Sequence, residues 1–152
     1  MAVGRAIWGS LKTVLFVVRF KDIPALKKWR SAIMDTGLNV HECRILAIVE
    51  SKKERQAMGD VSSVAFISEG DFSFLGQLKN EEAKEVLDSK FDALVAYEEI
   101  PKKIGKAIEK MSFRHDIGIN TESESHKIVF NTKEGDPKDI LNFIKTTLEK
   151  IA

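Results

Sequence analysis

Short apolar runs alternate along the chain with segments whose apolar residues recur at helical spacing. The runs lie at Thr13–Phe20, Cys43–Val49, Val64–Ile67, Phe91–Tyr97, His115–Ile119 and Lys127–Phe130. The first and fourth are apolar at almost every position, and strands of that kind must be covered on both faces by helices. The alternation predicts a single α/β domain with three α/β/α layers, Rossmann-like, whose mainly parallel sheet has about six strands.

Helices are predicted between most of these strands. The first begins after Asp22, a good N-cap residue, with Pro24 in its first turn, and ends near Gly37. Others are expected at 81–89, at 101–111 and from Pro137 onward. The link 120–125 is polar and suits a hairpin rather than a crossover, so an antiparallel edge strand is allowed at 127–130.

The predicted strand order selects a set of loop residues as a candidate ligand site. Neighbouring strands tend to pair and crossovers are right-handed, which places the first strand centrally, the next two on one side and the later ones on the other. Ligands of open α/β sheets bind where that order reverses, beyond the carboxyl ends of the strands. The candidate ligand-binding residues at these ends are Arg19, Asp22, Ser68, Asp71, Tyr97 and Glu98.

Two interpretations of these six residues remain open. In one, Arg19 binds an anionic group of a sugar or phosphorylated metabolite, and Asp22 or Glu98 acts as a base. In the other, they are ordinary solvated loop ends, as most exposed carboxylates are. The sequence therefore allows three functions: a binding module without catalysis, an enzyme with Asp22 as base, or a structural interaction protein.

Length and charge limit the class of protein. The 152 residues are long enough for one domain, 1–152, with 1–11 as an N-terminal extension that has the apolar spacing of a short helix. That stripe would pack on the domain or on a second copy, giving a homodimer. With 24 basic and 23 acidic residues the net charge is +1, which argues against nucleic acid as a partner.

The N-terminal segment and the single cysteine bear on location. Lys12 and Arg19 bracket an apolar run too short for the core of an export signal, and nothing approaches the roughly 18 apolar residues of a membrane span. Cys43 has no second cysteine to pair with, which fits a reducing compartment. We therefore expect a cytoplasmic protein without membrane contact.

Motifs for cofactors, metals and covalent catalysis are missing from the sequence. The nine glycines form neither G-x-G-x-x-G nor G-x-x-x-x-G-K-[ST], and no G-x-S-x-G occurs. His41 and Cys43 share a strand face, but nothing recruits His115 or His126 to complete a zinc site. His126 is better interpreted as a polar group at a strand edge and Cys43 as a core thiol. No cofactor and no metal are predicted.

The aromatic segment DFSFLG, residues 71–76, follows the third strand. We expect Phe72, Phe74 and Leu75 to fold back and close the end of the core, because burying a ring is worth a couple of kcal/mol. The alternative is an exposed lip beside a binding site.

Segments of the sequence resemble those of two protein families. SVAFISEGDFSFLGQLKN, FDALVAY, FRHDIGI and ILNFIKTTLEKIA together resemble an uncharacterised family of small cytoplasmic α/β proteins from Bacteroidota, over about residues 64–152. That resemblance implies the fold and no activity.

The second and fainter resemblance is to the acceptor-side half of heptosyltransferase-like glycosyltransferases. It implies a catalytic aspartate at Asp22, ahead of Pro24. Lys21 replaces the glycine usual before that aspartate, and we expect no second domain for a nucleotide-sugar donor.

Overall fold

The computed structural model describes residues 13–35, 42–51, 53–54, 64–121, 126, 128–133 and 135–150. Several expectations from the sequence concern residues outside these ranges. They concern the N-terminal stripe at 1–11, Gly37, His41 and most of the polar stretch 50–62.

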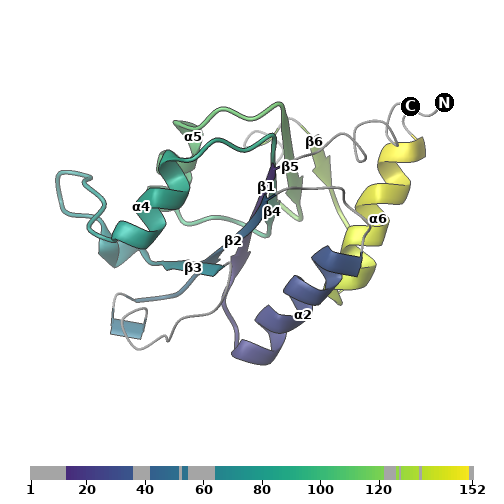
Figure 1. The fold of residues 1–152 in the computed structure, drawn as a ribbon, viewed down its shortest axis with the longest axis horizontal. Helices are drawn as coiled ribbons and strands as arrows, with labels where there is room; N and C mark the ends of the chain where they lie inside the picture. The colour runs from purple at the N-terminus through teal and green to yellow at the C-terminus, as the bar shows by residue number, and fades with distance from the viewer. Residues whose placement is uncertain are drawn as a thin grey trace.

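A single sheet organises the described part of the chain (Figure 1). Its strands are β1 (Thr13–Arg19), β2 (Glu42–Ile48), β3 (Val64–Ile67), β4 (Ala93–Tyr97), β5 (His115–Ile119) and β6 (Ile128–Phe130). They pair in the order β3-β2-β1-β4-β5-β6, and every pair is parallel. The predicted α/β fold, the central first strand and the reversal between β1 and β4 are confirmed.

Helices cover the sheet on both faces, which produces three layers. α2 (Ile23–Asp35) and α6 (Pro137–Lys150) lie side by side on one face, and α4 (Glu81–Asp88) and α5 (Lys102–Glu109) lie on the other (Figure 1). β1 serves both layers because its side chains alternate. Val14, Phe16 and Val18 pack under α2 and α6, whereas Leu15 and Val17 pack under α4 and α5. This explains why every residue from Val14 to Val18 is apolar.

The allowance for an antiparallel edge strand is wrong, because β6 runs parallel to β5. Asn120, directly after β5, holds Thr132, shortly after β6. Its side chain accepts the Thr132 N–H at 2.9 Å and donates to the Thr132 carbonyl at 3.1 Å. The carboxyl ends of the two strands are thereby tied side by side. Asn120 has φ 57, a left-handed conformation that asparagine tolerates well.

The expectation for the aromatic segment is also wrong in two of its three residues. Phe72 packs against the core under α4 and pairs with Leu78 through an antiparallel bridge. Between them the chain makes a tight turn at Gly76, whose φ of +85 suits glycine. Phe74 and Leu75 lie at the tip of this turn and are 95% and 76% exposed. The turn carries them away from the core that Phe72 reaches.

Candidate functional site

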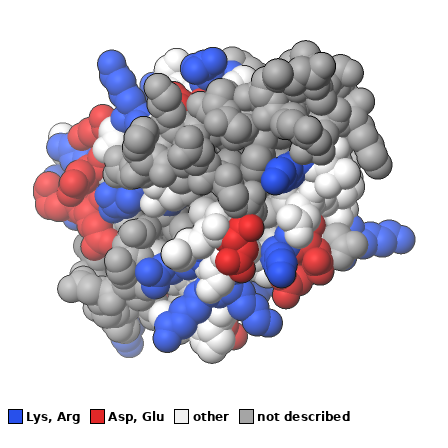
Figure 2. Space-filling model, turned by 45° about the vertical axis from the view of Figure 1, so that its right-hand side comes forward, with Lys and Arg blue, Asp and Glu red and all other residues white. Residues whose placement is uncertain are grey.

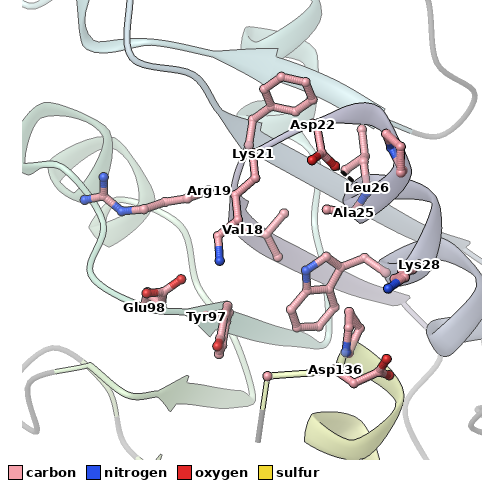
Figure 3. A pocket seen from close by; sticks show the side chains of 15 residues that line it. Val18, Arg19, Lys21, Asp22, Ala25, Leu26, Lys28, Tyr97, Glu98 and Asp136 are labelled. Atoms are coloured by element: carbon pink, nitrogen blue, oxygen red, sulfur yellow. Dashed lines mark hydrogen bonds between the residues drawn. The ribbon is translucent and has the colours of Figure 1, made fainter.

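A cleft of about 280 Å³ opens at the carboxyl ends of β1 and β4, where the strand order reverses. The first turns of α2 and α6 form its opposite wall. Figure 3 shows Asp22, Lys28 and Asp136 on the helix side, with Tyr97 and Glu98 on the strand side. This is the position at which open α/β sheets bind their ligands.

Asp22 holds the N-terminus of α2. Its Oδ1 accepts the Ala25 N–H at 2.8 Å, and its backbone carbonyl accepts the Leu26 N–H at 3.2 Å. This is the N-cap arrangement that the sequence predicted, with Pro24 in the first turn, where its missing N–H has no helical partner to lose. The carboxylate is exposed and directed at its own helix (Figure 3).

Asp136 holds the N-terminus of α6 in the same way. Its Oδ1 accepts the Lys138 N–H at 3.0 Å and its carbonyl accepts the Ile140 N–H at 3.0 Å. Both helices that face the cleft are therefore capped by a carboxylate of the protein itself. The positive end of each helix, which in many α/β proteins binds a phosphate, already has an anionic partner here.

An aromatic pair lines the inner part of the cleft. The rings of Trp29, from α2, and Tyr97, the last residue of β4, have centroids 5.3 Å apart and are tilted by 54°. Trp29 is only 7% exposed, and Tyr97 is half-buried. Burial, and secondarily the charge of Glu98, raises the pKa of Tyr97 above its ordinary value of 10.0. Tyr97 is therefore a neutral hydrogen-bonding group at neutral pH.

Glu98 has a backbone conformation that non-glycine residues seldom adopt, with φ 68. Its N–H donates to the Ile119 carbonyl at 2.8 Å, which extends the ladder between β4 and β5 by one residue before the chain turns. A left-handed non-glycine residue costs of order 1–2 kcal/mol. Such strain is concentrated at functional sites, and here it places a carboxylate at the mouth of the cleft.

Arg19 lines the cleft but does not face Asp22. Its Nε donates to the Glu99 carbonyl at 3.0 Å, and Figure 3 shows the side chain extending away from Asp22. Lys21 and Lys28 also line the cleft, so three basic side chains stand against the carboxylates of Asp22, Glu98 and Asp136. Among the described residues on the side turned forward in Figure 2, basic and acidic side chains are likewise intermixed.

Ser68 and Asp71 are not part of this cleft. They are 0% and 1% exposed and form a buried polar cluster with Asn80, which is 6% exposed. Asp71 Oδ2 accepts the Ser68 N–H at 2.9 Å and the Asn80 side-chain amide at 3.1 Å. The Asn80 amide also donates to the Phe66 carbonyl at 2.7 Å, while its Oδ1 caps α4 by accepting the Ala83 N–H at 3.1 Å. The cluster fastens the end of β3 to the start of α4.

The structure thus brings together Arg19, Asp22, Tyr97 and Glu98 of the six residues selected from the sequence. Sequence reasoning missed Lys28, Trp29 and Asp136 as residues of the cleft. Trp29 lies seven residues, or two helical turns, after Asp22, and that spacing could have placed it on the same face of the helix, behind the cleft mouth. Asp136 is followed directly by Pro137, and Asp22 is followed two residues later by Pro24. This shared pattern of an aspartate before a proline could have identified Asp136 as the cap of a second helix.

Metal binding and membrane insertion find no support in the part of the chain that is described. No group of three or more His, Cys, Asp or Glu side chains among those residues could hold a metal ion. Cys43 is half-buried, and burial raises the pKa of its thiol to about 11, which disfavours the thiolate that metals bind. Within the same residues no helix is both long and apolar enough to cross a bilayer.

Comparison with known proteins assigns the chain to a family. Residues 4–151 match a family of unknown function, DUF6913. The chain belongs to this family. The expected membership of an uncharacterised family is confirmed at that level, and family membership assigns no activity. No curated protein matches the chain.

Proposed function

We propose that the cleft between β1, β4 and the starts of α2 and α6 binds a small, uncharged, sugar-like ligand, and that the domain is a binding module without catalysis. One observation carries the proposal. Carboxylates from three separate segments, Asp22, Glu98 and Asp136, line the same cleft as the pair formed by Trp29 and Tyr97. Carboxylate oxygens accept hydrogen bonds from ligand hydroxyls, and an aromatic wall provides apolar contact with a ring.

The size of the cleft agrees with a ligand of this kind. Its volume of about 280 Å³ lies just below the range of drug-sized ligand sites, which runs from about 300 to 1,000 Å³. A monosaccharide is a suitable size, whereas a nucleotide sugar is larger than the enclosed space. Polar and apolar groups both contribute to the lining, as is usual where a few polar groups orient a ligand against an apolar wall.

An anionic ligand, the other class expected from the sequence, is less well supported. A phosphate would compete with Asp22 and Asp136 for the N-termini of α2 and α6. The three basic and three acidic residues of the lining balance one another. A neutral ligand loses nothing to repulsion from the capping carboxylates, which is why we favour it.

The catalytic alternative, which follows the resemblance to glycosyltransferases, would use Asp22 as base and Arg19 as anion clamp. Both residues line the cleft, but each is bonded to the protein backbone. Asp22 Oδ1 caps α2, and Arg19 Nε is held by the Glu99 carbonyl. Catalysis would therefore depend on Asp22 Oδ2 and on the terminal nitrogens of Arg19. Because Asp22 is directed at its own helix and Arg19 extends away from it, we favour helix capping over proton transfer as the role of Asp22.

A thermal-shift screen tests the proposal with neutral monosaccharides, the matching sugar phosphates and nucleotide sugars. A ligand at 100 times its Kd adds about 2.7 kcal/mol to stability, so binders are readily detected. We expect shifts from neutral sugars that weaken in Glu98→Gln, which removes one charge and keeps the size. Glu85→Gln, on the exposed side of α4, is the matched control and should leave the shift intact.

Two results would contradict the proposal. Stronger binding of the sugar phosphates, dependent on Arg19 or Lys28, would identify the site as an anion site. Turnover of a nucleotide sugar that is abolished in Asp22→Asn would establish the catalytic alternative. Silence across the whole screen would remove small-molecule binding at this cleft.

A further inference from the structure

A second cleft, of about 410 Å³, lies on the other face of the sheet beside α5. Its apolar wall is formed by Leu94, Ile100, Ile108, Met111 and Phe113. Leu94 and Ile108 are buried, whereas Ile100, Met111 and Phe113 are half-buried and present apolar surface to the cleft. The cleft is separate from the first, because the two share no lining residue.

β5 supplies polar positions to this cleft. In the register of the parallel pair, Asp116 lies beside Leu94 and Gly118 beside Ala96, so both point to the α4 and α5 side of the sheet. The alternate residues Ile117 and Ile119 pack in the other core. β5 therefore has an apolar face under α6 and a polar or empty face toward α5, although it is an interior strand.

His126 occupies the space above Gly118. A Cβ at position 118 would overlap the imidazole ring of His126 and the hydroxyl oxygen of Thr121. His126 Nδ1 lies 2.6 Å from Asp116 Oδ1, and the two side chains are 6% and 22% exposed. Glycine at 118, aspartate at 116 and histidine at 126 thus fit together as one unit that holds the imidazole at the edge of the cleft.

The bond to Asp116 fixes which ring nitrogen carries the proton of the neutral imidazole. A carboxylate only accepts hydrogen bonds, so Nδ1 must be the protonated donor in this contact, and Nε2 is left as the acceptor. Among the described residues Nε2 has no hydrogen-bond partner. Neutral His126 consequently offers an acceptor lone pair at Nε2, whereas the more common histidine tautomer carries its proton on that nitrogen.

The charges around the cleft do not select an ionic ligand. Lys102, Lys106 and Glu109 come from α5, Glu99 from the segment after β4, and Asp116 from β5. Two basic groups stand against three acidic ones, and one of the acids is paired with His126. The remaining selective features are an apolar wall and one acceptor.

We infer that this second cleft binds a small uncharged molecule with an apolar body and a hydroxyl group, such as a phenol, and that the hydroxyl donates to His126 Nε2. Asp116 is a positioning residue that sets the tautomer, and Gly118 makes room for the ring. The inference stands independently of the first cleft, because it depends on residues that take no part there.

NMR of protein labelled with ¹⁵N-histidine tests the tautomer directly. The His126 signals are assigned by their loss in His126→Gln. In the neutral state we expect the proton on Nδ1, and we expect Asp116→Ala to restore the common Nε2–H form. A purely structural role for Asp116 would leave the tautomer unchanged, and an Nε2–H form in the unaltered protein would overturn the inference.

Three matched probes test the ligand class: 4-propylphenol, 4-propylanisole and 4-propylbenzoate. We expect the phenol to bind and to shift His126 Nε2, and we expect binding at least about tenfold weaker in His126→Gln, the loss of one hydrogen bond. Glu85→Gln should bind it normally. Equal binding of the anisole would show that no hydroxyl is recognised, and preference for the benzoate would identify an anion site. Failure of the phenol to bind would also overturn the inference.

Discussion

Two polar clusters at the same edge of the sheet have opposite roles. Ser68 and Asp71 follow β3, whereas Asp22 and Glu98 follow β1 and β4. The first pair is buried and hydrogen-bonded within the protein, and the second is open to solvent along a cleft. The difference comes from position in the sheet. β3 is an edge strand whose end is closed by α4, while β1 and β4 are central and their crossovers leave in opposite directions.

Polar residues at the carboxyl end of a strand therefore do not by themselves indicate a ligand site. A buried cluster should control stability and leave binding unaffected until the fold fails. An exposed cluster should control binding at little cost in stability. This distinction would be contradicted by a variant of the buried cluster that changes binding without loss of stability, or by a variant of the exposed cluster that unfolds the protein.

The largest effect is expected from Asp71→Ala. The change removes the acceptor of the Ser68 N–H and of one of the two Asn80 amide hydrogens, and both donors remain buried. Each unsatisfied buried group costs about 1–3 kcal/mol, so we expect a loss of about 3 kcal/mol in the free energy of unfolding, measured in urea. Asp71→Asn keeps one oxygen for both donors and should cost less. A loss under about 0.5 kcal/mol would show that the cluster is not structural.

Much of the fold could be predicted from periodicity because central parallel strands are apolar on both faces. Val64–Ile67 and His115–Ile119 were predicted with the bounds that the structure has, and the strand order followed from pairing and handedness rules. The direction of β6 could not be predicted in this way. The parallel pairing with β5 is accompanied by the bonds between Asn120 and Thr132, a contact across the loop that periodicity does not encode.

The candidate site was predictable in location and only partly in membership. The topological rule placed it at β1 and β4, and it also selected Ser68 and Asp71 because the sequence does not show how α4 closes over β3. Their partner Asn80 appears in the sequence as an ordinary helix cap. Burial by a neighbouring element is the feature that separates the two clusters, and it is set by tertiary packing.

A smaller effect is expected from Asp22→Ala and Asp136→Ala. Each change removes one capping bond of an exposed carboxylate, and such caps are worth about 1 kcal/mol. Chemical denaturation of each single variant measures the cost, and Asp→Asn at the same positions should retain most of the capping. If the two exposed caps cost as much as Asp71→Ala, the distinction between a structural and a binding cluster would be lost.

The ionisation of Tyr97 reports the environment of the cleft. It is the only tyrosine in the chain, so phenolate absorbance during an alkaline titration follows this residue alone. We expect the pKa of Tyr97 to lie above 10.0. In Glu98→Gln it should fall only part of the way toward that value, because the Glu98 charge is the smaller of the two causes and burial remains. A midpoint at the ordinary value would show that the ring is solvated.

The same shift has a consequence for stability. The folded-state pKa of Tyr97 lies above the unfolded one, so the unfolded chain releases the phenolic proton first as the pH rises. The shift in the Tyr97 pKa therefore contributes fully to the free energy of unfolding below about pH 10, and this contribution is lost as the pH rises through the folded-state pKa. Tyr97→Phe removes this titration, so its stability relative to the unaltered protein should rise over that alkaline window and stay constant below it.

The smallest effect is expected from Ser68→Ala, inside the buried cluster itself. The backbone N–H of Ser68 binds Asp71. The Ser68 hydroxyl faces the Asp71 N–H in a capping-box arrangement, but its buried oxygen makes no hydrogen bond with the described residues. Replacing an unsatisfied buried hydroxyl by a methyl group removes a desolvation cost and preserves the backbone bond. We therefore expect stability to be unchanged or to rise by up to about 1 kcal/mol, in contrast to Asp71→Ala three residues away. A clear loss would mean that the hydroxyl has a partner, and that Ser68 belongs functionally with Asp71.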